Sequence, residues 1–190
     1  MTLAAIAGPS ALVAAVATVL GAVFLILFFR KGGQWGLLND IASIVLMLAT
    51  IPVALLLGGA DDAGWRGLNA PVVTAIGVIG MLGASVSQAL LVARVRTYKQ
   101  LLPWTLGAGA VVGVWYLLVG FLGLQAEFPL ILNLLAIASG AGFIAIGYGF
   151  WRGNEQHPLS IAGGVVLLIA STGFLAWVGL AAIAAYGLSR

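Results

Sequence analysis

Among the polar residues inside otherwise apolar segments of the chain, five could together bind a ligand. They are Asn39, Asp40, Ser43, Ser85 and Gln88. Polar side chains are costly inside a membrane, so those that occur there are either paired structurally or used for function. At about 1.5 Å per helical residue, Asn39, Asp40 and Gln88 fall roughly 5–8 Å below the same membrane boundary. The sequence therefore predicts one polar cluster that could bind a cation, a polar solute or a lipid headgroup.

Asp40 also has a purely structural interpretation. A carboxylate in the first turn of a helix is stabilised by the positive end of the helix dipole. It could also pair with a basic residue at the same boundary, namely Arg30, Lys31, Arg94 or Arg96. Contact with a partner subunit is a third interpretation, and the sequence leaves all three open. Thr105 and Ser160 enter the membrane at similar or shallower depth from other segments.

The chain lacks the residues that most catalytic and cofactor-binding sites need. The chain has no cysteine and a single histidine, His157, which lies in a polar stretch, so thiolate metal sites and bis-histidine haem ligation have no ligands. Lys31 and Lys99 fall in short polar connections, which leaves no intramembrane amine for a Schiff base. No nucleotide-binding or hydrolase motif occurs. We therefore expect no enzymatic activity and no cofactor.

The composition is that of a membrane protein. Of 190 residues, 63% are hydrophobic and only 7% are charged, whereas a soluble domain carries about 25% charged residues. The net charge is +3, but the eight basic residues are dispersed rather than clustered, so nucleic acid is not an expected partner. The expected partners are membrane lipids and other membrane protein subunits.

The apolar sequence divides into segments long enough to cross a hydrocarbon core of about 30 Å. Their predicted bounds are 8–29, 36–58, 71–93, 103–123, 128–150 and 160–186. Five of the six prolines fall at or just before a predicted N-terminal turn, where the missing N–H costs little. A β-barrel is the weaker alternative, because the runs do not alternate in polarity. We predict an all-α, polytopic integral membrane protein, a six-helix bundle with short loops that forms one domain over residues 1–190.

Basic residues in the connections predict the orientation, because they stay on the cytoplasmic side. The connections after the first, third and fifth spans contain Arg30, Lys31, Arg94, Arg96, Lys99 and Arg152. The opposite side has Arg66 and Arg190 with the acidic residues Asp61, Asp62 and Glu127. Both termini are therefore predicted to lie outside the cytoplasm. The membrane itself is predicted to be a bacterial inner membrane. Three tryptophans fall at the predicted cytoplasmic boundary, as interfacial residues do: Trp35, Trp104 and Trp151.

Small residues at four-residue spacing predict how the helices pack. Gly109 and Gly113 form a GxxxG pair, and Gly80 with Ala84 and Ala136 with Gly140 are similar pairs that favour close helix approach. We expect these contacts within the bundle rather than in a dimer. Trp115, Tyr116 and Trp177 lie far from the predicted boundaries, so they either fill the packing or line a pocket or pigment-binding surface.

Two functions from different classes follow. An accessory or scaffolding subunit that binds lipid, pigment or a larger membrane complex is favoured by the low polar content and the short loops. A small transporter or channel-like protein is the alternative, supported by the polar cluster around Asp40 and Gln88 and by Pro52, which lies inside the second span and is expected to kink it.

Overall fold

The computed structural model describes residues 2–59, 69–153 and 157–188, and within these ranges the chain forms six helices and no strand. The helices are α1 (Leu3–Lys31), α2 (Gln34–Gly58), α3 (Asn69–Val92), α4 (Tyr98–Gln125), α5 (Leu130–Arg152) and α6 (Pro158–Leu188). All six are long and apolar enough to cross a membrane. The prediction of an all-α, six-helix membrane bundle is confirmed.

The helix starts differ from the predicted ones at two prolines. The predicted first and fourth spans began beside Pro9 and at Pro103, but both prolines lie inside longer helices. At the start of α4 the backbone N–H of Thr97 donates to Oε1 of Gln100 (3.1 Å), which caps the helix one turn before Pro103. Helix α2 also continues past Pro52 as a single helix. Proline near a helix start is therefore compatible with an additional turn on its N-terminal side.

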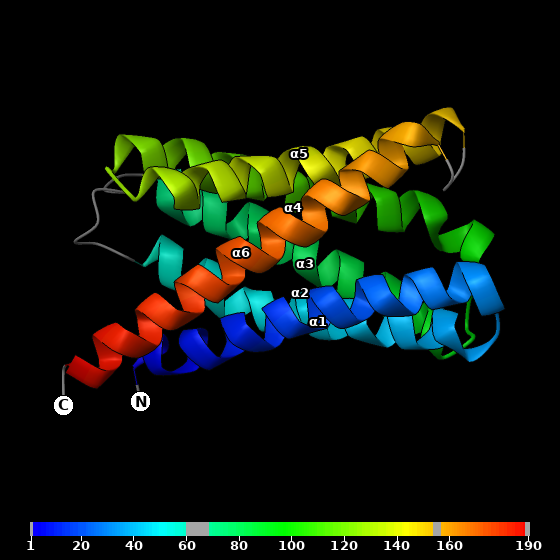
Figure 1. Cartoon of the computed structure of the whole chain (residues 1–190), viewed down its shortest axis with the longest axis horizontal. Helices are drawn as coiled ribbons and strands as arrows, with labels where there is room; N and C mark the ends of the chain where they lie inside the picture. The colour runs from blue at the N-terminus through cyan, green and yellow to red at the C-terminus, as the bar shows by residue number, and fades with distance from the viewer. Residues whose placement is uncertain (1, 60–68, 154–156, 189–190) are drawn as a thin grey trace.

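The helices form a closed ring in chain order. Each helix packs against its neighbours in the sequence, and α1 packs against α6 to complete the ring. Helix α6 runs obliquely, so that it begins beside α5 and ends beside α1 (Figure 1). The N- and C-terminal ends of the described chain consequently lie near each other at one end of the bundle (Figure 1).

Glycines set the closest helix contacts in this ring. A Cβ atom added at Gly163 on α6 would lie 2.7 Å from the carbonyl oxygen of Gly142 on α5, and one added at Gly142 would lie 2.8 Å from the carbonyl oxygen of Gly163. Gly113 on α4 and Gly140 on α5 approach each other in the same way. These backbones touch because neither residue has a side chain, which is how helices gain van der Waals contact in lipid. The predicted small-residue pairs thus contribute to packing inside the bundle.

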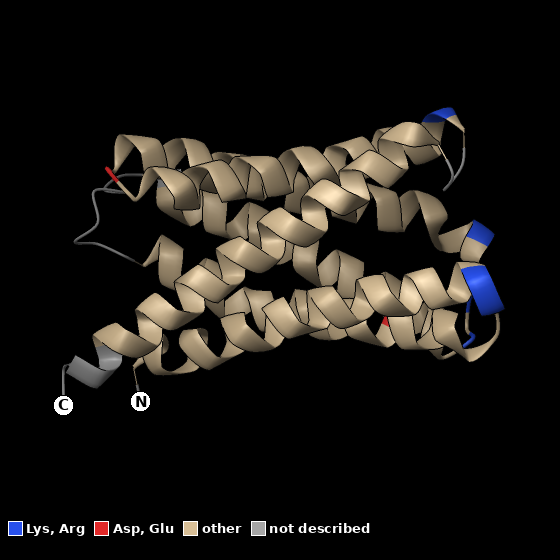
Figure 2. Ribbon diagram, in the orientation of Figure 1, with Lys and Arg blue, Asp and Glu red and all other residues tan. Residues whose placement is uncertain are grey.

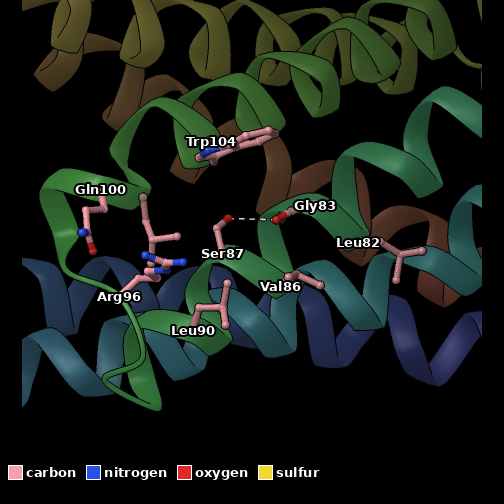
Figure 3. Close-up of a pocket in the computed structure, with 9 residues that line it drawn as sticks. Leu82, Gly83, Val86, Ser87, Leu90, Arg96, Gln100 and Trp104 are labelled. Atoms are coloured by element: carbon pink, nitrogen blue, oxygen red, sulfur yellow. Dashed lines mark hydrogen bonds between the residues drawn. The ribbon is translucent and has the colours of Figure 1, made fainter.

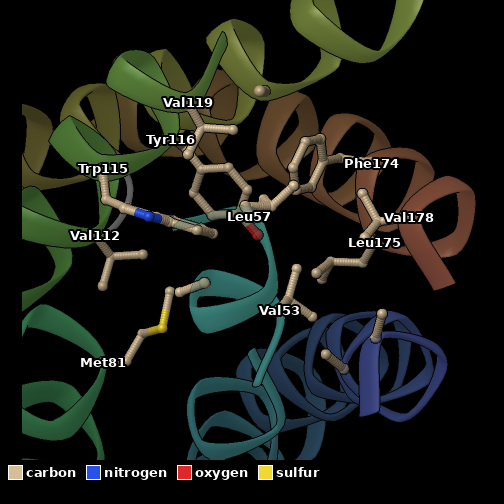
Figure 4. Packing of buried hydrophobic residues seen from close by; sticks show 14 of the residues in the cluster. Val53, Leu57, Met81, Val112, Trp115, Tyr116, Val119, Phe174, Leu175 and Val178 are labelled. Carbon is tan, nitrogen blue, oxygen red and sulfur yellow. The ribbon is translucent and has the colours of Figure 1, made fainter. Parts of the chain in front are cut away.

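The centre of the ring is filled by large side chains (Figure 4). Trp115 and Tyr116 of α4 are fully buried, together with Phe174 of α6. The Tyr116 ring meets Phe174 edge-on, with centroids 5.5 Å apart, and the Tyr116 hydroxyl hydrogen-bonds Oγ of Ser171 (3.2 Å). Helices α4 and α6, which are not neighbours in the ring, are therefore joined through its centre. Trp115 and Tyr116 fill the packing rather than line a pocket.

Apart from Asp40 within α2, the charged side chains of the described residues lie at the two ends of the bundle (Figure 2). The basic end, formed by the ends of α1, α3 and α5, the connections that follow them and the first turn of α4, carries Arg30, Lys31, Arg94, Arg96, Lys99 and Arg152. Glu127 lies at the opposite end, between α4 and α5. Asp61, Asp62, Arg66 and Arg190 lie outside the described residues. The two ends thus differ in charge as the connections predict.

Candidate functional site

A cavity of about 160 Å³ lies between α2, α3, α4 and α5, in the half of the bundle nearest the basic end. Its polar lining residues are Ser43, Gln88 and Thr105, each from a different helix. Met47 and Phe143 supply large apolar walls. A mostly apolar pocket with a few convergent polar groups is the usual form of a small-molecule site.

Gln88, which lines the cavity, has a buried polar atom without a hydrogen-bond partner among the described residues. That atom is its side-chain oxygen, Oε1. A buried carbonyl without a donor costs about 1–3 kcal/mol relative to a paired one. Gln88 therefore favours a bound water or solute that carries an N–H or O–H donor.

Ser43 and Thr105 add further oxygen atoms around the same space. The Ser43 hydroxyl donates to the backbone carbonyl of Asn39 one turn earlier (2.9 Å), so its remaining capacity is that of an acceptor. The Thr105 side chain is half-buried in the wall formed by α4. Gln88 Oε1 and the Ser43 hydroxyl thus offer acceptors, and the Thr105 hydroxyl can donate or accept, which suits a ligand with hydrogen-bond donors.

Two glycines keep the cavity open. A Cβ atom added at Gly147 on α5 would meet nothing within 4 Å, and one added at Gly109 on α4 would meet only the Phe143 ring, at 3.9 Å. The two glycines of the GxxxG pair therefore have different roles. Gly113 packs against α5, whereas Gly109 borders the cavity.

The structure brings together two of the five residues singled out in the sequence. Ser43 and Gln88 both line the cavity, whereas Asn39, Asp40 and Ser85 do not. Asn39 faces α1, with its Oδ1 3.8 Å from a Cβ atom added at Gly21. The Ser85 hydroxyl is buried and donates to the backbone carbonyl of Met81 (2.8 Å).

Asp40 is half-buried on α2, and its carboxylate interacts with the side chain of Asn39. Among the described residues no lysine or arginine forms an ion pair with it. The predicted alternative of pairing with a basic residue at the boundary is therefore absent from this conformation. Asp40 precedes the cavity residue Ser43 by three positions, so the two lie on neighbouring parts of the same helix surface.

The cavity ends against the packed centre of the ring. Its wall residue Phe143 stacks on Tyr116, with centroids 6.0 Å apart and planes at 21°. Beyond Tyr116 lie Trp115, Phe174 and Leu175, all buried (Figure 4). A ligand in the cavity would therefore be separated from the opposite end of the bundle by closely packed side chains.

No group of three or more histidine, cysteine, aspartate or glutamate side chains occurs among the described residues in an arrangement that could hold a metal ion. The polar side chains that line the cavity are neutral and can bind a ligand through hydrogen bonds. Comparison with protein-family models, with curated proteins and with solved structures finds no match to this chain.

Proposed function

We propose that this membrane protein binds a small polar solute in the cavity between α2, α3, α4 and α5, as a transporter does in one of its states. The observation that carries the proposal is Gln88, which lines that cavity and whose buried Oε1 has no hydrogen-bond partner among the described residues. Because Gln88 Oε1 and the Ser43 hydroxyl offer acceptors, the favoured ligand carries N–H or O–H donors, as small ammonium, amide and hydroxyl compounds do. Asp40, three positions before Ser43, adds a negative charge that favours a cationic solute.

The proposed location is a bacterial inner membrane, with the basic end in the cytoplasm and both termini outside. The charge difference between the two ends of the bundle supports this orientation (Figure 2). Trp104 and Trp151, which lie near the basic end and are each 75% exposed, suit the headgroup level of that leaflet. In this orientation the cavity belongs to the cytoplasmic half of the membrane.

The packed centre of the ring favours a gated site over a permanently open channel. Passage through the bundle would require Tyr116 to separate from Ser171 and Phe174. Such a rearrangement is the usual requirement of alternating access, in which a site opens to one side at a time.

An accessory or scaffolding subunit is the second candidate function, and the protein is not proposed to be an enzyme. The accessory function is favoured by the small polar content of the cavity, which holds three polar side chains. Native mass spectrometry of protein extracted gently from its own membrane separates the two functions. A small-molecule adduct on the monomer or homo-oligomer would support solute binding. A second polypeptide or a pigment would support the accessory function.

Replacement of Gln88 by leucine is expected to remove the small adduct and to raise the free energy of unfolding by about 1–3 kcal/mol in the unliganded protein. The gain arises because the substitution removes a buried acceptor that lacks a donor. Thermal unfolding in detergent and native mass spectrometry measure the two effects. Ser85→Ala is the control, since the Ser85 hydroxyl is satisfied within α3 and lies outside the cavity. Destabilisation by Gln88→Leu would contradict the proposal, because it would show that the amide supports the fold.

A further inference from the structure

A second and larger recess, of about 580 Å³, lies between α3 and the beginning of α4. Its side chains come from the last turns of α3, from the connection that follows, and from the first turns of α4 (Figure 3). The residues that determine its chemistry are Leu82, Val86, Leu90, Arg96, Gln100 and Trp104. None of them lines the solute cavity, so this groove is a separate feature.

The groove is polar at one end and apolar at the other. Arg96 and Gln100 lie at one end, and Leu82 lies at the opposite end (Figure 3). The apolar part, from Leu82 to Leu90, runs about 12 Å along α3 at 1.5 Å per residue. Half of a hydrocarbon core is about 15 Å thick. The groove therefore matches an amphipathic ligand that has a polar head at the membrane boundary and a chain within one leaflet.

The backbone on both sides of Arg96 is held by hydrogen bonds. The N–H of Val95 donates to the carbonyl of Leu90 (3.0 Å), a bond of the type that closes a helix C-terminus. On the other side, the N–H of Thr97 donates to Oε1 of Gln100 (3.1 Å). These bonds hold the backbone on both sides of Arg96, which is exposed, at this end of the groove.

The polar end of the groove carries positive charge without a compensating acid. No acidic residue lines it, and Arg96 forms no ion pair within the described part of the chain. Arg94 and Lys99 flank it in the sequence and add positive charge at the same end of the bundle. Trp104, which is largely exposed at the edge of the groove, is suited to the headgroup level. The complementary ligand is an anion with an apolar chain.

We propose that the groove between α3 and α4 binds an anionic phospholipid of the leaflet at the basic end. Arg96 holds the phosphate, with Gln100 beside it, and an acyl chain lies along Leu82, Val86 and Leu90. Basic pockets between transmembrane helices are known to select anionic headgroups. The proposal does not depend on solute binding in the central cavity.

The test is native mass spectrometry of the delipidated full-length protein, titrated with phosphatidylglycerol and, separately, with phosphatidylcholine. The wild type is expected to bind phosphatidylglycerol more tightly. Arg96→Gln is expected to weaken that binding about fivefold, the factor for one basic residue at an anionic membrane surface. Arg152→Gln is the matched control, because Arg152 lies at the same end of the bundle over Tyr148 and outside the groove. Equal binding of both lipids by the wild type, or equal losses in the two variants, would overturn the proposal.

A second pair of variants tests the apolar part without changing any charge. Val86→Trp places a large ring in the groove at a residue that is 57% exposed, so the fold is expected to tolerate it. It is expected to reduce the number of tightly bound phosphatidylglycerol molecules. Ile79→Trp, on the same helix at a residue 66% exposed and outside the groove, is expected to leave the number unchanged. Unchanged lipid binding by Val86→Trp would place the lipid elsewhere and overturn the proposal.

Discussion

Trp115→Ala is expected to lower the free energy of unfolding by about 3–5 kcal/mol, the range for removal of a buried aromatic side chain. Trp115 is 1% exposed in the centre of the ring and meets the Tyr116 ring edge-on, with centroids 4.7 Å apart. Its ring also fills the space beside Gly77, where an added Cβ atom would lie 2.5 Å from it. The surrounding helices can close only part of the resulting space, because close glycine contacts such as that of Gly113 with Gly140 restrict their movement. Denaturant unfolding in detergent, followed by circular dichroism, measures the effect.

Trp177→Ala is the matched control for this prediction. Trp177 belongs to α6 and is 43% exposed, so its removal leaves a smaller cavity and a much smaller loss of stability is expected. Equal losses for the two tryptophans would contradict a packed centre of the ring. The same result would remove the argument against a permanently open channel.

Gly163→Ala is expected to destabilise the bundle by about 1–3 kcal/mol, as overpacking does. The added methyl group would lie 2.7 Å from the carbonyl oxygen of Gly142 and 3.0 Å from the backbone nitrogen of Ile146. Both atoms belong to the backbone of α5, so the two helices must move apart to accommodate it. Thermal unfolding in detergent measures the effect.

Substitution of the neighbouring glycine, Gly164, is expected to change the stability in the opposite direction. A methyl group at Gly164 would meet nothing within 4 Å. Alanine is preferred to glycine inside a helix by about 0.5–1 kcal/mol, so Gly164→Ala is expected to be neutral or slightly stabilising. Adjacent positions in one helix should therefore respond with opposite sign. A similar response at both would contradict the close crossing of α5 and α6.

The number and type of helices could be predicted from the sequence because lipid imposes a length of apolar sequence on every span. The start of α4 could not be predicted in this way. Pro103 is typical of the first turn of a helix, but Thr97 and Gln100 cap the helix earlier in the chain. Proline position reports where a helix tolerates a missing N–H. It does not report which preceding residue begins the helix.

The sequence predicted the depth of the candidate site in the membrane. It did not predict how each helix is rotated about its own axis. The rise per residue places Asn39, Asp40 and Gln88 at one level, yet of these only Gln88 faces the cavity. Helices that are apolar around their whole circumference carry no polar face to indicate which side turns inward. In the structure α2 is rotated so that Asn39 lies near Gly21 of α1 rather than in the cavity. Phe143 and Gly147 also line the cavity, but nothing in the sequence distinguishes them, because apolar residues and glycines occur throughout the chain.

The most direct test of the central claim is cysteine accessibility of the cavity, because the chain contains no native cysteine to give background reaction. Ser43→Cys and Thr105→Cys are labelled with a membrane-impermeant thiol reagent in sealed vesicles of each orientation. Lys99→Cys, at an exposed residue in the first turn of α4 at the basic end, reports which side is accessible. Ser139→Cys, at a residue of α5 that is 0% exposed, is the buried control.

The account predicts that both cavity cysteines react only from the side on which Lys99→Cys reacts, while Ser139→Cys stays unlabelled. This result would establish a water-filled cavity that opens to the basic end and is closed to the other. Cavity cysteines that react no faster than Ser139→Cys, or that react equally from both sides, would contradict it.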